Sequence, residues 1–234
     1  MVHRVMKIIR SSWRTPGTGR RGFTLIEMLI VVGIIILLMA LSFPAIGRAL
    51  RSAKRGKCQA HLQELGKIST MYTRHNASNE REYYPSSDWR WELIRYLRDT
   101  NSILAIAACP SADRRPVSES SYSAHPAVFS GNFKSTRIWY PSATLLMADG
   151  TVSGSGDASR LATSLSGYVN STNTNQVPAG VFSDRDGSAD GRLSLRHSGT
   201  GRPTCNVMFA DAHVQPYQSG ELLESNISTN RYPR

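Results

Sequence analysis

Three residues near the C-terminus have side chains that often carry chemistry. His197, Asp211 and His213 are of the types that serve in acid–base catalysis or bind metal ions. The surrounding sequence offers neither a nucleophile in a recognisable turn nor a further ligand at helical or hairpin spacing. We therefore expect these side chains to be hydrogen-bonded structural residues, and we expect the chain not to be an enzyme.

A short acidic run has the composition of a cation site. Asp184, Asp186 and Asp190 alternate with other residues around Gly187, which can direct several carboxylate oxygens at one hard cation, as in short calcium loops. The alternative is a pair of ordinary Asp-Gly turns, because aspartate and glycine are common turn residues. No glutamate follows at the twelfth loop position, so the run is not an EF-hand. Calcium is the one cofactor that the sequence suggests, and both interpretations stay open.

The cysteines are too few for a disulfide-rich scaffold. Cys58, Cys109 and Cys205 also lack the paired short spacing of a zinc site. If the C-terminal part of the chain is exported, one pair can be oxidised and one thiol is left over.

A single carboxylate, Glu27, lies within an otherwise uncharged stretch from Phe23 to Leu41. At about 1.5 Å per residue these 19 residues span about 28 Å, close to the ~30 Å hydrocarbon core of a bilayer, and they predict one transmembrane helix. An unpaired carboxylate in lipid costs roughly 2.5 to 3.5 kcal/mol at a helix centre. Glu27 therefore either reaches the nearby interface or has a function.

The formal charge of +11 is concentrated before this stretch. Residues 1–22 hold six of the 28 Lys and Arg and none of the 17 Asp and Glu, so the remainder has 28 − 6 = 22 basic and 17 acidic residues, or +5. We do not expect a nucleic-acid role, because no basic stripe interleaved with aromatic residues follows. Charge alone leaves the membrane topology open, since five cations follow the stretch: Arg48, Arg51, Lys54, Arg55 and Lys57.

A long helix is predicted from 23 to 76. Pro44 cannot donate a backbone hydrogen bond to the carbonyl of Ala40, so a kink or a locally unwound segment is expected there. Beyond it, apolar residues recur at helical spacing and form one stripe on a polar helix: Cys58, Leu62, Leu65, Ile68 or Ser69, and Tyr72.

Residues 77–234 are predicted to form a separate head, so the fold class is α+β. A short helix is expected at 89–99, with Trp91, Ile94 and either Leu97 or the stem of Arg98 buried. Residues 151–176 are rich in Ser, Thr, Gly and Asn, which predicts an exposed loop or an insertion. A small antiparallel sheet should pack on the C-terminal half of the long helix. It is built from the predicted strands 103–108, 135–140, 144–148 and 192–195 and from the segment 206–217, in which Asp211-Ala212 provides a turn before 213–215.

The residues around Glu27 resemble a known processing site. Arg20-Arg21 followed by Gly22-Phe23-Thr24-Leu25-Ile26-Glu27 is similar to the cleavage site of type IV prepilins, a family that includes the pseudopilins of type II secretion. The resemblance implies that prepilin peptidase cuts between Gly22 and Phe23 and methylates the new amino group of Phe23. Residues 1–22 would then be a cytoplasmic leader peptide, and Pro44 also matches the family.

The resemblance also implies how the chain is used. Glu27 would meet the N-terminal amine of a neighbouring subunit, because two opposite charges that are costly separately in low dielectric become tolerable together. The partners would be prepilin peptidase, other pilin or pseudopilin subunits and an inner-membrane assembly platform, with the head periplasmic or extracellular. Two alternatives remain: a membrane-tethered head that binds a ligand or acts as an enzyme, and a minor pilin for DNA uptake.

Several head segments resemble the subgroup of prepilin-like proteins named for an H-X9-DG signature. Here thirteen residues separate His197 from Asp211, and Ala212 replaces the expected glycine, which argues against a left-handed turn at 212. The extra residues, within 199–203, are expected to lengthen a hairpin loop. The resemblance further implies that Cys58 pairs with Cys109, with Cys205 buried and reduced.

Overall fold

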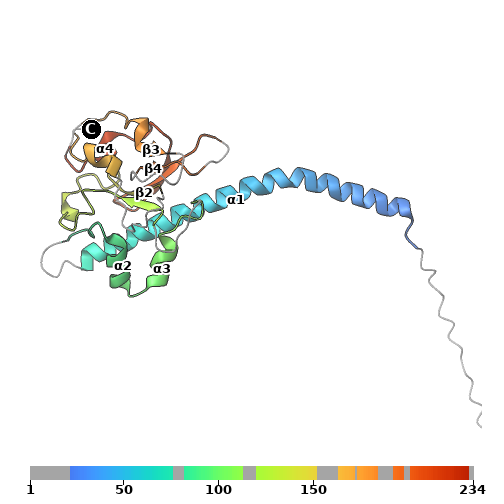
Figure 1. The fold of residues 1–234 in the computed structure, drawn as a ribbon, viewed down its shortest axis with the longest axis horizontal. Coiled ribbons are helices and arrows are strands. Elements are labelled where there is room, and N and C mark those ends of the chain that lie inside the picture. Colours follow the sequence, from blue (N-terminus) through green and yellow to red (C-terminus); the bar gives the residue numbers. More distant parts are fainter. Residues whose placement is uncertain are drawn as a thin grey trace, which may run out of the picture. The chain divides into compact units, whose positions relative to one another are not determined.

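The computed structural model describes residues 22–75, 82–112, 120–151, 163–171, 173–183, 192–197 and 201–231. The chain divides into two compact units, Met1–Pro44 and Ala45–Arg234. The longest element is helix α1 (Leu25–His75), whose 51 residues contribute to both units (Figure 1).

The N-terminal unit contains the apolar part of α1. Its large side chains from Phe23 to Phe43 are exposed, and the apolar window of the helix makes no buried contact. A helix that is apolar on all sides, unburied and this long is compatible with a single-pass membrane anchor. Helix α1 is continuous through Pro44, so the structure has no unwound segment there. The kink expected at this proline stays a prediction.

The C-terminal part of α1 lies in the core of the second unit. The predicted stripe is confirmed, because its members include the buried residues Cys58, Leu62, Leu65, Ile68 and Ser69. Gly66 extends the stripe, since a side chain there would collide with Met208. The helix ends at His75, one residue from the predicted boundary.

A four-stranded antiparallel sheet accompanies the helix and confirms the α+β class. Its strands stand in the order β1 (Tyr122–Ala124), β2 (Leu145–Asp149), β5 (Cys205–Phe209) and β6 (Val214–Tyr217). A second sheet of two short parallel strands, β3 (Phe182–Ser183) and β4 (Leu193–Ser194), was not expected.

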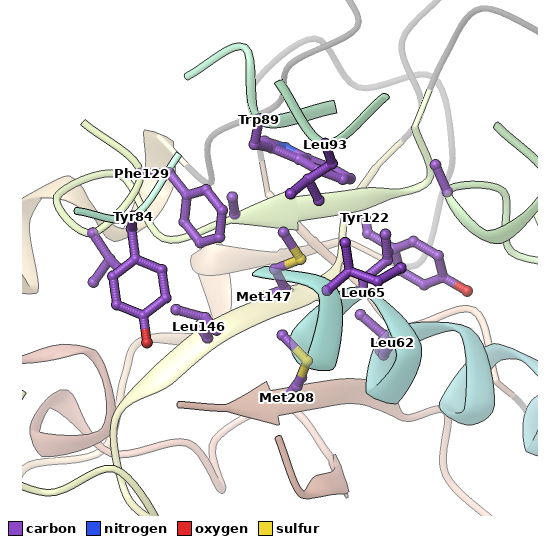
Figure 2. Packing of buried hydrophobic residues seen from close by; sticks show 14 of the residues in the cluster. Leu62, Leu65, Tyr84, Trp89, Leu93, Tyr122, Phe129, Leu146, Met147 and Met208 are labelled. Carbon is purple, nitrogen blue, oxygen red and sulfur yellow. The ribbon is translucent and has the colours of Figure 1, made fainter. Parts of the chain in front are cut away.

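The two central strands of the large sheet are buried on both faces. One hydrophobic cluster joins α1 to Met147 of β2 and Met208 of β5, and a second cluster joins Leu145 and Val207 of the same strands to the C-terminal segments. Figure 2 shows Leu62 and Leu65 beside Met208 in the first cluster. The sheet is therefore a middle layer between two cores.

A register shift in β2 explains why two successive residues share one core. The pairing with β5 is irregular between Leu145 and Met147, where a β-bulge places one extra residue. Leu146 and Met147 both join the α1 cluster, although successive strand residues normally point to opposite faces.

Two predicted strands are wrong. Residues 103–108 fall largely in helix α3 (Thr100–Ile106), which begins where the Asp99 side chain accepts a hydrogen bond from the Ser102 amide at 3.1 Å. This N-cap outweighs the β propensity of the isoleucines. Residues 135–140 contain the 3₁₀ helix η2 (Ser135–Arg137) instead of a strand.

The short helix α2 (Trp89–Leu97) exists as predicted, but of the residues expected to be buried only Ile94 is. Trp89 and Leu93 lie in the core, whereas Trp91 is 45% exposed and Leu97 is also exposed. The buried pair is four residues apart, and the Trp89 ring contacts Phe129 from a distant segment. That partner, which local periodicity does not reveal, selects the face.

The predicted insertion at 151–176 is more ordered than expected in the part that the structure describes. The 3₁₀ helix η3 (Thr163–Tyr168) places Leu165 in the second hydrophobic cluster with no exposed surface. The 3₁₀ helix η4 (Ala179–Val181) and helix α4 (Glu224–Ile227) complete the head and contribute Val181 and Ile227 to the same cluster. The described part of 151–176 therefore helps, together with η4 and α4, to cover the second face of the sheet.

Candidate functional site

The predicted cleavage site precedes α1 in an open, non-helical segment. Gly22 has open space on every side, and Phe23 is 79% exposed. A protease needs an extended and accessible substrate, so the geometry at the Gly22–Phe23 bond suits cleavage. In the described residues, this segment therefore presents the expected bond before helix α1 begins.

Helix α1 starts with a capping box formed by Thr24 and Glu27. The Glu27 Oε2 atom accepts hydrogen bonds from the Thr24 amide and from the Thr24 hydroxyl, each at 2.8 Å, and the Glu27 amide lies 3.3 Å from the Thr24 hydroxyl oxygen. Such a box satisfies backbone donors that the first helical turn leaves open. The carboxylate thus has local polar partners at the start of the apolar helix.

The capping box uses one carboxylate oxygen of Glu27. All the described contacts of this side chain involve Oε2 and come from Thr24. Within the residues that the structure describes, Oε1 has no partner, so it can accept a donor from another chain. The arrangement is compatible with both a helix cap and an intersubunit contact.

A disulfide joins Cys58 of α1 to Cys109, with the two Cα atoms 5.2 Å apart. This is the pairing that the family resemblance implied. Cys205 is free and buried on β5, as expected, and burial raises the pKa of its thiol well above the ordinary value. Its thiol is therefore protonated and shielded from reagents.

His197 lies beside Asp149 at the end of β2. Its Nε2 atom is 3.1 Å from Asp149 Oδ2, which also accepts a hydrogen bond from the Asn206 amide at 2.7 Å, and both side chains are almost completely buried. His197 is thus buried and within hydrogen-bonding distance of a carboxylate, and its structural role stays a prediction. Its backbone pairs with Thr204 through two hydrogen bonds, and the loop expected within 199–203 lies partly outside the described residues.

The disulfide and His197 are close together. The Nε2 atom of His197 is 3.7 Å from Cys109 Sγ, and the ligand atoms of Cys58, Cys109 and His197 lie within 4.8 Å of one another. Because the two sulfurs are bonded to each other, neither is a thiolate that could bind a metal ion. The cluster instead ties α1, the segment after α3 and the segment before β5 together.

Asp211 and His213 form an exposed turn between β5 and β6. Asp211 Oδ1 accepts a hydrogen bond from the His213 amide at 3.1 Å and lies 2.6 Å from His213 Nδ1. Ala212 has φ of +69°, so the left-handed turn that the alanine argued against is present. The Cβ of Ala212 lies 3.3 Å from the position that a side-chain carbon on Gly66 would take, which is one packing contact of this turn with α1.

Asp149 is the residue that sequence reasoning missed. A signal was present, because LLMADG at Leu145–Gly150 is similar to VMFADA at Val207–Ala212. In both segments an aspartate follows a run of apolar strand residues, at the end of β2 in the first and two residues after β5 in the second. Only the pairing of β2 with β5 reveals that the first aspartate, rather than Asp211, lies beside His197.

The acidic run lies outside the described residues. Asp184, Asp186 and Asp190 belong to the stretch between β3 and residue 192. Calcium binding there therefore stays a prediction.

Comparison with known proteins identifies the N-terminal segment. Comparison of the chain with curated proteins and with solved structures found no match. Residues 18–43 match the family model described as the prokaryotic N-terminal methylation motif. This range covers the open Gly22–Phe23 bond, the Thr24–Glu27 capping box and most of the apolar helix, and the chain therefore carries the N-terminal segment of a type IV prepilin-like protein, the kind of substrate that prepilin peptidase processes.

Proposed function

We propose that this chain is a structural, non-enzymatic pilin-like subunit of a type II secretion or type IV pilus-like filament. Prepilin peptidase cuts between Gly22 and Phe23 and methylates Phe23. The mature helix anchors the subunit in the inner membrane, with the head on the periplasmic or extracellular side, until an assembly platform adds it to a filament.

The observation that carries the proposal is the methylation motif at 18–43, which continues directly into an apolar helix with no buried contact. A helix that is apolar on all sides needs lipid or other apolar helices around it. A membrane supplies the first environment before assembly, and neighbouring subunits supply the second afterwards. The apolar surface of the helix can therefore contact lipid before assembly and neighbouring subunits in the filament.

Glu27 sets the register between subunits in this proposal. Cleavage leaves a charged amine at Phe23 of each subunit, and Glu27 of a neighbour offers Oε1 while Oε2 holds the helix cap. Removing one member of a buried charge pair costs about 3 to 5 kcal/mol, because the other charge is left without compensation. The cost would recur at every subunit contact.

The test must separate the charge of Glu27 from its capping role. Glutamine can replace glutamate in a capping box, so Glu27→Gln keeps the cap and removes the charge, whereas Glu27→Ala removes both. Both variants should insert and be cleaved, because the helix becomes more apolar and the Gly22–Phe23 bond is unchanged. Both should fail to form filaments.

The control is Thr24→Ala, which weakens the cap by about 1 kcal/mol and retains the carboxylate. It should assemble. The readouts are mass spectrometry of membrane-extracted protein for N-methylated Phe23, and microscopy of sheared filaments from cells that express each variant alone. Met1 retained in wild-type cells would exclude processing, and normal filaments from Glu27→Gln would show that Glu27 only caps the helix.

A further inference from the structure

A cationic face follows the apolar part of α1 without an intervening acid. The chain has no Asp or Glu between Glu27 and Glu64. The face consists of five residues: Arg48, Arg51, Lys54, Arg55 and Lys57. Four of the five are exposed and Arg55 is half-buried. In the part of the chain that the structure describes, none of them is paired with a carboxylate. Helix α1 thus leaves its apolar segment with several uncompensated positive charges.

The side chains of this face point back toward the apolar segment. Every Cα–Cβ bond of an α-helix is tilted toward the helix N-terminus, so long side chains cover the preceding turn. The structure shows this directly, because an Arg51 guanidinium nitrogen lies 3.8 Å from the position that a Cβ on Gly47 would take. The charge of Arg51 is therefore about one turn closer to the apolar segment than its Cα.

This reach brings the Arg48 charge to the depth of the lipid headgroups and the Arg51 charge close to them. Arg48 follows Leu41 by seven positions, or about 10 Å of helix, and folding back by one turn leaves its guanidinium about 5 Å beyond Leu41. The headgroup layer is roughly 5 to 7 Å thick on each side of the hydrocarbon core. The Arg51 guanidinium is about one turn further out, within the ~8 Å Debye length of that layer.

We propose that Arg48 and Arg51 bind the phosphates of anionic phospholipids in the leaflet from which α1 emerges, with the rest of the cationic face adding long-range attraction. The guanidinium fork can hold two phosphate oxygens at once, and long cationic side chains near a helix end reach the interface readily. The proposal rests on the membrane insertion described above. It assigns the cationic face a ligand while the subunit is held in the membrane.

Lipid selectivity measured on the full chain tests the proposal. The protein is reconstituted into phosphatidylcholine vesicles that contain a trace of spin-labelled phosphatidylglycerol or spin-labelled phosphatidylcholine, and electron paramagnetic resonance gives the motionally restricted fraction of each. A cation near the surface adds about 1 kcal/mol of attraction, or about fivefold. The preference for phosphatidylglycerol should therefore fall at least fivefold in Arg48→Gln/Arg51→Gln.

The matched control is Lys67→Gln/Arg74→Gln, which removes the same charge from exposed positions further along α1. Lys67 lies about 39 Å of helix beyond Leu41, several Debye lengths from the headgroups. The preference of this control variant for phosphatidylglycerol should therefore differ from that of the wild type by less than twofold. At 1 M salt, where the Debye length is ~3 Å, the difference between wild type and the Arg48/Arg51 variant should largely vanish. Circular dichroism confirms that each variant retains its helix content.

Several outcomes would overturn the proposal. An unchanged preference in the Arg48/Arg51 variant would show that other cations, including those of residues 1–22, account for it. An equal loss of preference for phosphatidylglycerol in both variants would show that only the net charge of the chain matters, and not the position of Arg48 and Arg51. Salt-dependent binding of a labelled DNA duplex that disappears in the Arg48/Arg51 variant, without lipid preference, would identify nucleic acid as the ligand. Failure of the chain to resist carbonate extraction from the vesicles would instead refute membrane insertion and with it the proposed function.

Discussion

Replacing Asp149 with alanine should destabilise the head strongly, although no motif marks this residue. Its Oδ2 atom accepts a hydrogen bond from the Asn206 amide at 2.7 Å and lies 3.1 Å from His197 Nε2, in a fully buried site. A hydrogen bond to a charged group contributes about 1.5 to 3 kcal/mol, so losing two should cost about 3 to 6 kcal/mol. The buried backbone amide of Asn206, on a central strand, would then lose its acceptor.

Asp211→Ala is the matched comparison. Asp211 follows an apolar strand and also contacts a histidine, but both side chains are well exposed. Exposed charge pairs contribute about 0 to 1 kcal/mol, because water competes for both groups. We therefore expect Asp211→Ala to lower the free energy of unfolding by about 1 kcal/mol or less.

Urea unfolding of the full chain in detergent micelles measures both effects. Tryptophan fluorescence is a suitable probe, because Trp89 is fully buried in the core of the head. Circular dichroism at the helical minimum provides a second probe, and the two should give the same midpoint for a cooperative transition. If Asp211→Ala shifts the midpoint as much as Asp149→Ala, the reasoning from burial is refuted.

Three further predictions concern stability. Removing the disulfide with Cys58→Ala/Cys109→Ala should cost about 4 kcal/mol in the chain-entropy model, because the cysteines are 51 positions apart, and a midpoint that reductant shifts in wild type but not in the double variant would support this. His125 is fully buried, with Nε2 2.6 Å from the Ile227 carbonyl oxygen, and burial lowers its pKa from 6.5 to about 4. The unfolded chain therefore takes up the proton first, so stability present above pH 6.5 should fall as the pH drops from 6.5 to about 4, by up to about 3 kcal/mol, and a pH series on His125→Gln should lack this component. Ala212→Gly should stabilise the head by about 1 kcal/mol in thermal melts, because alanine at φ +69° is strained whereas glycine is not, and a lower melting temperature would show that the Ala212 methyl contact with α1 matters more.

The parts of the structure that sequence reasoning predicted well are those that local patterns specify. The stripe from Cys58 to Ser69 repeats with the helical period, so both the helix and its buried face could be read directly. The strand at 144–148 and the hairpin around Asp211 are apolar runs bounded by turn residues, and both were predicted correctly. In each case the information lies within about ten residues.

Tertiary contacts decided most of the rest. The segment at 103–108 is an exception, because it has the composition of a strand and the local Asp99 cap makes most of it part of a helix. Helix α2 buries Trp89 instead of Trp91 because Phe129, far away in sequence, contacts that side. Such outcomes depend on which surfaces meet, and a period within one segment carries no information about its partner.

The chain by itself determined the methylation motif and an apolar helix long enough to cross a membrane, because a short motif and the length and polarity of a single helix do not depend on tertiary contacts. The tertiary structure decided which aspartate lies beside His197. Thirteen residues separate His197 from Asp211, but the pairing of β2 with β5 brings Asp149, 48 positions before His197, within 3.1 Å of its ring. Burial of that pair follows from two cores closing on opposite faces of one sheet, which requires the whole head to be folded.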